Sequence, residues 1–268
     1  MNKKVLSLVG AGAVFAAGLT GTAAYAGGND HAAKKPTVVL VHGAFADSSG
    51  WNGVVQRLQK DGYPVVAAAN PLRGVASDAT AVRALLDSID GPIVLVGHSY
   101  GGSVISKAAA GDKDVKALVY VAAFLPQAGE SAADLSGKFP GSTLGDTLKQ
   151  VPLPGGHVDL YIDQDKYPRQ FAADVPLKDA KLSAVSQRPI DQAALAEDAA
   201  GAQAWQTIAS YDLISGADKN IPPAAQQWMA ERAHAKVRTV KGASHSVFVS
   251  HPGTTASFIE KAARETVR

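Results

Sequence analysis

Residues 93–102 of this 268-residue chain read IVLVGHSYGG. Four β-type apolar residues lead into a Gly-x-Ser-x-Gly turn, and a stretch rich in small residues follows it. A strand, a sharp turn and the start of a helix form the nucleophile elbow, in which the central serine is exposed at the top of a sheet. Glycine suits positions 97 and 101 because a Cβ at either would crowd the turn. The stretch therefore predicts that Ser99 attacks a carbonyl carbon.

A serine hydroxyl needs an adjacent base, and the base needs a carboxylate that fixes its tautomer. Behind an elbow of this kind the chain order is serine, acid, histidine. His245 follows the expected strand 236–240 through a short loop, and we expect it to be the base. His251 is the weaker candidate, because it directly precedes Pro252 and is typical of a helix entry.

Asp218 is the expected acid, since it lies in the loop that follows the expected strand 211–215. Asp212 is one competitor, but it lies at the start of that strand and so at the wrong end of the sheet. Glu130, just past the fourth expected strand, is the second competitor, because the acid occupies that strand end in some enzymes of this kind.

Two backbone N–H groups should face the oxyanion, one of them from the residue after the nucleophile, Tyr100. The other comes from the loop after the first strand, where Ala44 is the expected donor and Phe45 the fallback. Phe45 and Tyr100, with Phe124 and Leu125, also flank the site and are expected to line an apolar substrate pocket. The alternative for Phe124 and Leu125 is that they pack in the hydrophobic core. We expect His42 and His98 to be structural.

From Pro36 onward, apolar runs alternate with helical patterns, which is typical of βαβ units and a parallel sheet. Several runs lack polar alternation, as in strands covered on both faces. Asp47-Ser48-Ser49 can cap the first helix, and Ser77 is the expected N-cap of the second. The expected strands are 37–41, 64–68, 92–96, 115–121, 211–215 and 236–240, and the expected helices are 51–60, 77–89, 103–110, 224–235 and 254–266.

Residues 127–207 break this alternation and are too many for a simple connection. The segment opens rich in glycine and proline, then becomes alanine-rich after Asp191, where we expect helix. An insertion between the fourth and fifth expected strands, above the carboxyl ends of the sheet, predicts a cap over the site.

The first 26 residues have the organisation of a secretory signal peptide. Lys3 and Lys4 precede an apolar stretch diluted by glycine and alanine, and Ala24-Tyr25-Ala26 fits a cleavage site. We therefore expect an exported protein, periplasmic or secreted, with a single mature domain of residues 27–268 and no membrane anchor after cleavage. An uncleaved N-terminal anchor is the alternative.

Composition excludes several classes of function. The chain has no cysteine, which rules out a cysteine nucleophile and thiolate metal sites. Without Lys3 and Lys4 the 26 basic residues fall to 24 and balance the 24 acidic ones. No basic stripe suggests nucleic acid as a partner. The predicted chemistry needs neither a cofactor nor a metal.

These features together resemble the α/β-hydrolase superfamily over residues 36–268. Four segments look like the compact branch of plant methyl esterases, hydroxynitrile lyases and related bacterial esterases: VVLVHGAFADSSGW (38–51), VLVGHSYGG (94–102), SGADKNIPP (215–223) and GASHSVFVSHP (242–252). The resemblance implies a mainly parallel six-stranded sheet flanked by helices, with a cap after the fourth strand. It also implies Ser99, Asp218 and His245 as nucleophile, acid and base.

Two departures from the lyases of that branch bear on function. Those lyases carry threonine after the first histidine to help hold the cyanohydrin, and a lysine after the catalytic histidine to handle cyanide; here Gly43 and Ser246 occupy those positions. Ser99 also excludes the dehalogenases of the superfamily, which use aspartate at the elbow. The sequence therefore predicts an exported serine hydrolase that cleaves carboxylic esters of small molecules through an acyl-enzyme.

Two alternatives remain. One is a perhydrolase or another acyl-transfer activity on the same triad. The other is a noncatalytic ligand-binding protein on a hydrolase fold. Lactone, thioester and amide substrates are also open, and the sequence predicts no oligomeric state.

Overall fold

The computed structural model of the protein describes residues 35–267. The predicted signal peptide, its cleavage site and the predicted start of the mature chain lie outside the described residues. Within residues 35–267, no helix has the length and apolar character that crossing a membrane requires.

Six parallel strands form the main sheet, in the order β2-β1-β3-β4-β8-β9. All of β3 and nearly all of β1 is buried, because helices cover both faces of the sheet. The predicted parallel sheet is confirmed. The first and last residues of each expected strand lie within two residues of those of the observed strand. The bounds are β1 Thr37–Val41, β2 Val65–Ala68, β3 Ile93–His98, β4 Val115–Val121, β8 Ser210–Ser215 and β9 Lys236–Val240.

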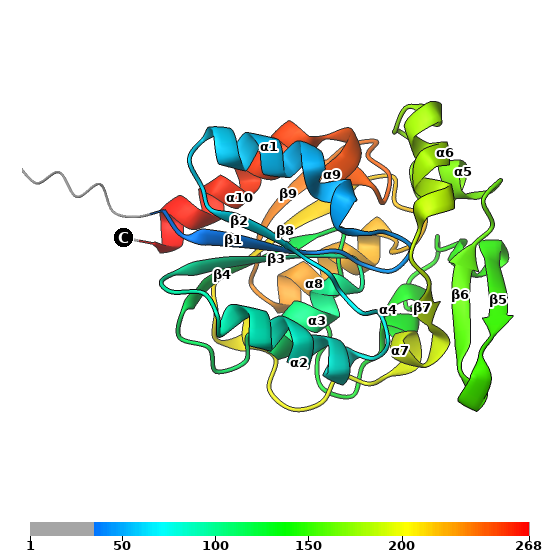
Figure 1. The fold of residues 1–268 in the computed structure, drawn as a ribbon, viewed down its shortest axis with the longest axis horizontal. Coiled ribbons are helices and arrows are strands. Elements are labelled where there is room, and N and C mark those ends of the chain that lie inside the picture. Colours follow the sequence, from blue (N-terminus) through cyan, green and yellow to red (C-terminus); the bar gives the residue numbers. More distant parts are fainter. Residues whose placement is uncertain (1–34, 268) are drawn as a thin grey trace, which may run out of the picture. The chain divides into compact units, whose positions relative to one another are not determined.

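Alternate residues of the strands pack against different helix layers. Val38 and Leu40 of β1 belong to one hydrophobic cluster, and Val39 and Val41 belong to the other. Figure 1 shows α1, α9 and α10 over one face of the sheet and α2, α3 and α8 over the opposite face. The bounds of these helices are α1 Asn52–Lys60, α2 Val75–Leu86, α3 Gly101–Ala108, α8 Pro223–Arg232, α9 Val247–Ser250 and α10 Pro252–Thr266.

The start of the second helix differs from the prediction, because α2 begins at Val75 and Ser77 is not its N-cap. Instead, the carboxylate of Glu197 accepts the N–H of Val75 at 2.6 Å and the N–H of Ala76 at 2.9 Å. The capping group comes from a distant part of the chain, so no local pattern could reveal it. Asp47 does cap, as expected, the 3-10 turn that leads into α1.

Residues 122–209 connect β4 to β8 and contain the predicted cap. The cap has its own antiparallel sheet in the order β5-β6-β7, which lies beyond the carboxyl ends of the main strands (Figure 1). Its elements are α4 Ala132–Gly137, β5 Leu148–Pro152, β6 Val158–Ile162, α5 Tyr167–Gln170, α6 Leu177–Ser186, β7 Ile190–Asp191 and α7 Gln192–Ala196, with 3-10 turns at Leu144–Thr147, Pro154–Gly156 and Ala204–Gln206.

The expectation of helix after Asp191 is largely wrong. Only α7 and one 3-10 turn form there, and the longest cap helix, α6, precedes that position. The backbone of Ala199 instead makes two hydrogen bonds across to the 129–130 turn, to the N–H of Gly129 and the carbonyl of Glu130. Tertiary pairing of this kind overrides the helix propensity of alanine.

Candidate active site

Ser99 lies directly after β3, in the turn that the sequence predicts. Its φ of 55° is in the left-handed region, which a non-glycine residue adopts only when its surroundings hold it there. A Cβ on Gly101 would lie 2.6 Å from the carbonyl oxygen of Val41, and one on Gly97 would lie 2.7 Å from that of Gly101. The glycines therefore permit the close packing from which the strained serine emerges.

His245 and Asp218 form a buried pair. Nδ1 of His245 lies 2.7 Å from Oδ2 of Asp218, and the two side chains are 1% and 0% exposed. A carboxylate at this nitrogen makes Nδ1 the protonated one and leaves Nε2 free to take a proton. The pair is therefore arranged as the acid and base of a serine hydrolase.

The Asp218 carboxylate is held in place by further donors. Oδ1 accepts the N–H groups of Asn220 and Ile221 at 2.7 and 3.1 Å. Oδ2 accepts Nε2 of Gln226 at 2.9 Å, and Gln226 is fixed in turn by the N–H of Ser215. With its hydrogen-bonding capacity satisfied, the buried carboxylate can hold His245 in one orientation.

Ser99 and His245 line the same cavity. Among the described residues, the Ser99 hydroxyl makes no hydrogen bond to the His245 ring. Contacts of this kind are often long without substrate and tighten in the substrate complex. The shared cavity, rather than a formed bond, is what joins the serine to the histidine–aspartate pair.

The competing candidates do not reach His245. Asp212 is buried within β8, and neither of its carboxylate oxygens has a partner in the described part of the chain. Glu130 makes hydrogen bonds of 2.7 and 2.8 Å to the guanidinium of Arg232. His251, the weaker candidate for the base, lies beside Ser250 and Asp174 and does not line the cavity of Ser99. Of the three candidate carboxylates, Asp218 is the one that the fold brings to His245.

The two histidines expected to be structural make supporting contacts. Nε2 of His98 donates to the backbone carbonyl of His245 at 3.0 Å, so it holds the loop that carries His245. Nδ1 of His42 donates to the Gly43 carbonyl at 2.9 Å, and its Nε2 accepts the N–H of Asn70 at 3.1 Å. Burial lowers the pKa of both side chains, that of His98 strongly, which keeps them neutral.

The structure separates the three candidate oxyanion donors. The N–H of Phe45 already donates to the Arg188 carbonyl of the cap at 3.0 Å, so Phe45 is not available as the fallback donor. Within residues 35–267, the N–H groups of Ala44 and Tyr100 have no hydrogen-bond acceptor, and both residues line the cavity with Ser99. Ala44 and Tyr100 are the pair that can serve an oxyanion.

The cavity around Ser99 has a volume of about 370 Å³, which is in the usual range for small-molecule sites. Of the predicted pocket residues, Phe45, Tyr100 and Phe124 line it and Leu125 does not. Leu125 is fully buried beneath the site, and its N–H is directed at the sulfur of Met229. The alternative of core packing is therefore correct for Leu125.

The predicted cap supplies much of the cavity wall, through residues that the sequence analysis did not identify. The ring of Phe171 lies edge-on to the His245 ring, with 4.8 Å between their centres. Other lining residues from the cap are small or apolar: Ala132, Ala133, Ser136, Gly137, Ser142, Leu144, Gly145, Leu148 and Leu195. These residues carry no recognisable spacing, and only the folded cap gathers them above Ser99.

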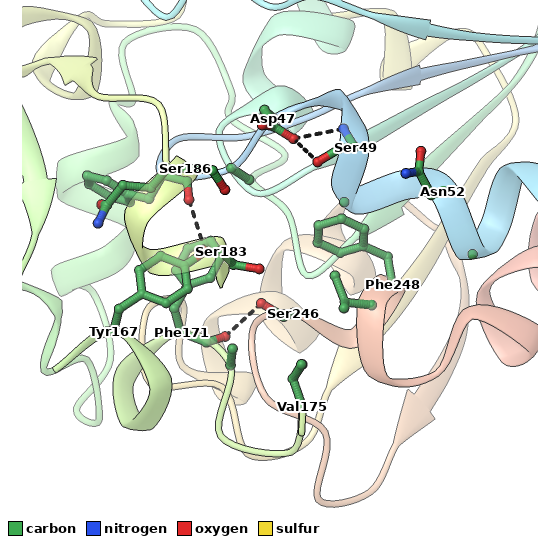
Figure 2. Close-up of a pocket in the computed structure, with 17 residues that line it drawn as sticks. Asp47, Ser49, Asn52, Tyr167, Phe171, Val175, Ser183, Ser186, Ser246 and Phe248 are labelled. Carbon is green, nitrogen blue, oxygen red and sulfur yellow. Dashed lines mark hydrogen bonds between the residues drawn. The ribbon is translucent and has the colours of Figure 1, made fainter. Parts of the chain in front are cut away.

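A second cavity of about 220 Å³ lies behind Phe45 and Phe171, which line both spaces. Figure 2 shows this second cavity, where the hydroxyl of Ser246 donates to the Phe171 carbonyl at 3.0 Å. The Ser246 N–H donates to the same carbonyl at 3.0 Å. The residue that follows His245 thus ties the histidine loop to the cap.

No group of three or more potential metal ligands occurs among the residues that the structure describes. The side chains at the site suit nucleophilic chemistry. The serine, the histidine–aspartate pair and the two free N–H groups together can form and break an acyl bond.

Comparisons with known proteins agree with the fold. A family model described as "Alpha/beta hydrolase family" matches residues 38–258. A putative chloroplastic methylesterase 11 of Arabidopsis thaliana is 26% identical over 84% of this chain, which spans only 63% of that protein. The alpha/beta hydrolase nvfD of Aspergillus novofumigatus is 28% identical, with 87% of this chain and 98% of that protein covered.

Solved structures show the same fold. The crystal structure of polyneuridine aldehyde esterase superposes with a TM-score of 0.73 at 20% identity, and the match covers 85% of this chain and 98% of the other.

Proposed function

The chain belongs to the α/β-hydrolase family, and from that membership we propose that it is a serine esterase that cleaves carboxylic esters of small molecules. The observation that carries the proposal is the buried 2.7 Å contact between His245 and Asp218 at the cavity that Ser99 lines. Relatives named as methylesterases support ester bonds as the substrate.

In the proposed reaction, Oγ of Ser99 attacks the ester carbonyl carbon while Nε2 of His245 takes its proton. The N–H groups of Ala44 and Tyr100 stabilise the oxyanion. The bond to the alcohol breaks as His245 returns the proton to the leaving oxygen. Water, deprotonated by His245, then cleaves the acyl-enzyme and releases the acid, and Ser99 recovers its proton.

The surroundings of residues 43 and 246 disfavour cyanohydrin cleavage. A Cβ at Gly43 would lie 2.6 Å from the Cβ of Ser99, so a threonine there would displace the nucleophile. Ser246, at the position of the lysine in the lyases, is occupied by its two contacts with the cap. The chain thus lacks both groups on which the lyase reaction depends.

Hydrolysis of p-nitrophenyl acetate and butyrate by the purified protein tests the proposal. We expect turnover and covalent labelling by a fluorophosphonate, and the loss of both in Ser99→Ala. Undiminished hydrolysis by Ser99→Ala would reject Ser99 as the nucleophile. An unlabelled, inactive wild type would favour a noncatalytic binding protein, and peracid formation from acetate and hydrogen peroxide would favour a perhydrolase.

We also propose that the protein is exported as a single domain of residues 27–268. The support is the sequence of residues 1–26, with its basic start, apolar stretch and Ala24-Tyr25-Ala26 site. Expression of the full chain in a bacterial host, followed by cell fractionation and N-terminal sequencing, tests this. A chain that begins at Gly27 outside the cytoplasm is expected, and an intact N-terminus in the cytoplasmic fraction would contradict it.

A further inference from the structure

The side-chain amide of Asn220 is buried, and only one of its two polar atoms has a hydrogen-bond partner among the described residues. The residue is 2% exposed, lies two positions after Asp218 and lines the cavity of Ser99. Its Oδ1 accepts a hydrogen bond of 2.9 Å from Nε2 of Gln170. Among the described residues, its Nδ2 has no partner. Buried polar groups are nearly always hydrogen-bonded, so an unpaired donor at a ligand cavity requires an explanation.

The neighbouring contacts fix which end of the amide is free. The Lys219 carbonyl can only accept, so the end of the Gln170 amide beside it is the NH₂ group, and the Thr143 hydroxyl donates to the other end, Oε1, at 2.9 Å. That NH₂ group donates to the Lys219 carbonyl and to Oδ1 of Asn220, each at 2.9 Å. A reversed Asn220 amide would place two NH₂ groups against each other. Nδ2 is therefore the free end.

The backbone of Asn220 is also fixed by hydrogen bonds. The hydroxyls of Ser136 and Ser142 donate to the Asn220 carbonyl at 2.8 and 2.9 Å. Its N–H donates to Asp218. With its backbone and its Oδ1 fixed, Asn220 presents a preorganised donor.

Elsewhere the cavity offers a ligand few polar contacts. No Lys, Arg, Asp or Glu is among the described residues that line it, and the two lining serines besides Ser99, Ser136 and Ser142, both donate to the Asn220 carbonyl. The remainder of the wall is mainly Ala, Leu, Ile and Phe side chains. A charged substrate would find no counter-charge there, whereas a neutral apolar one with a single oxygen acceptor would match it.

We propose that Nδ2 of Asn220 donates a hydrogen bond to a second oxygen of the substrate, separate from the ester group that Ser99 attacks. The preferred substrates are then uncharged, mainly apolar esters that also carry a keto, ether or second carbonyl oxygen. This inference rests on the proposed esterase function and adds its selectivity. Asn220 is a specificity-determining residue in this view, and it takes no part in the bond changes.

Matched esters test the inference. On the acyl side the pair is p-nitrophenyl 5-oxohexanoate and p-nitrophenyl hexanoate, and on the alcohol side it is 2-methoxyethyl acetate and butyl acetate. Wild type should prefer the oxygen-bearing ester in at least one pair by about fivefold to tenfold in kcat/KM, as one buried hydrogen bond provides. Rates of uncatalysed hydrolysis correct each pair for intrinsic reactivity.

Two variants separate recognition from structure. Asn220→Leu should bring the ratio within that pair close to one, because it removes the donor. Asn220→Asp keeps an acceptor for Gln170 but replaces the donor by an oxygen, and it should reverse the preference. If Asn220 had only a structural role, both variants would lower kcat/KM for the two esters alike and leave the ratio unchanged. Asn52→Leu, at an exposed asparagine of α1, is the matched control and should keep the wild-type ratio.

A binding measurement keeps the inference separate from catalysis. In the Ser99→Ala protein, ethyl 5-oxohexanoate should bind more tightly than ethyl hexanoate, and the added Asn220→Leu substitution should equalise the two dissociation constants. Turnover without any Asn220-dependent preference, by kinetics or by binding, would overturn the inference alone. Absence of turnover and of Ser99 labelling, with the binding preference intact, would overturn the esterase and leave the role of Asn220 standing.

Discussion

The hydroxyl of Tyr100 donates a hydrogen bond of 3.0 Å to Asp78, and both residues are fully buried. Asp78 also accepts the backbone N–H of Arg73, whose guanidinium reaches Asp159 and the Pro189 carbonyl of the cap at 2.7 and 3.1 Å. The residue whose N–H is proposed to hold the oxyanion is therefore anchored to α2 and, through α2, to the cap.

Tyr100→Phe should lower kcat several-fold with a smaller change in KM. The substitution removes the hydroxyl that fixes Tyr100 and leaves Asp78 with one donor fewer, which costs about 1–3 kcal/mol of stability. Steady-state kinetics and urea unfolding measure the two effects. Tyr120→Phe is the control, because Tyr120 is equally buried and bonds Ser106 at 2.8 Å. It should lose comparable stability but keep wild-type kcat, and equal losses of kcat would reject the anchoring role.

Asp218→Asn should lower kcat by about 10⁴-fold while leaving the fold intact, because an amide no longer fixes the required tautomer of His245. Glu130→Gln, which alters the contacts with Arg232 and with the Gln127 N–H and none with His245, should keep nearly full activity. Hydrolysis of p-nitrophenyl butyrate gives both numbers. If the glutamine variant lost activity and the asparagine variant kept it, the acid would be Glu130.

Gly43→Ala should lower kcat/KM by about 10²-fold, because the added Cβ would lie 2.6 Å from the Cβ of Ser99 and 2.7 Å from the His98 carbonyl. The backbone or the serine must move to relieve these contacts. Gly253→Ala is the control, since its Cβ would meet only the flexible Arg57 side chain at 3.4 Å. Equal activity of the two variants would show that the elbow tolerates the shift.

Glu197→Ala should lower the free energy of unfolding by about 0.5–2 kcal/mol, because it leaves the first N–H groups of α2 without their acceptor. Denaturant unfolding measures the loss. Glu231→Ala, an exposed position on α8, should stay within about 0.5 kcal/mol of wild type. An unchanged free energy of unfolding in Glu197→Ala would mean that water replaces the carboxylate at the helix start.

Asp212→Asn should change the free energy of unfolding, relative to wild type, more favourably at neutral pH than at acidic pH. Burial without a partner raises the pKa of Asp212 well above its usual value, so the folded state holds its proton where the unfolded state has lost it. The wild type therefore loses stability as the pH rises from the unfolded pKa of about 4 toward the folded one.

The asparagine variant lacks this loss, so its stability relative to wild type should increase between pH 4 and pH 7. Urea unfolding at several pH values measures the difference, with the exposed Asp165→Asn as control. A difference that does not change with pH would mean that Asp212 is already ionised in the folded protein.

Features encoded locally were predictable from the sequence. Short runs rich in apolar and β-branched residues predicted the six strands, and glycines 97 and 101 predicted the elbow, because each depends on neighbouring residues. Asp218 and His245 lie in loops just after β8 and β9, so adjacent parallel strands bring them together at one edge of the sheet.

Several of the errors lie where the cap meets the core. Glu197 takes over the capping expected of Ser77, and the Arg188 carbonyl occupies the N–H of Phe45. Phe171 and the free amide of Asn220 have no sequence pattern, because their surroundings come from segments far apart in the chain. Such contacts depend on the tertiary arrangement, and local spacing cannot indicate them.

The two hydrogen bonds from Ser246 to the Phe171 carbonyl have an evolutionary consequence. The cap segment that carries Phe171 both lines the pocket and holds the loop of His245. Replacement of the whole cap would therefore disturb the histidine loop as well as the pocket. Divergence of substrate preference within this lineage should therefore proceed by single replacements at the small and apolar wall residues.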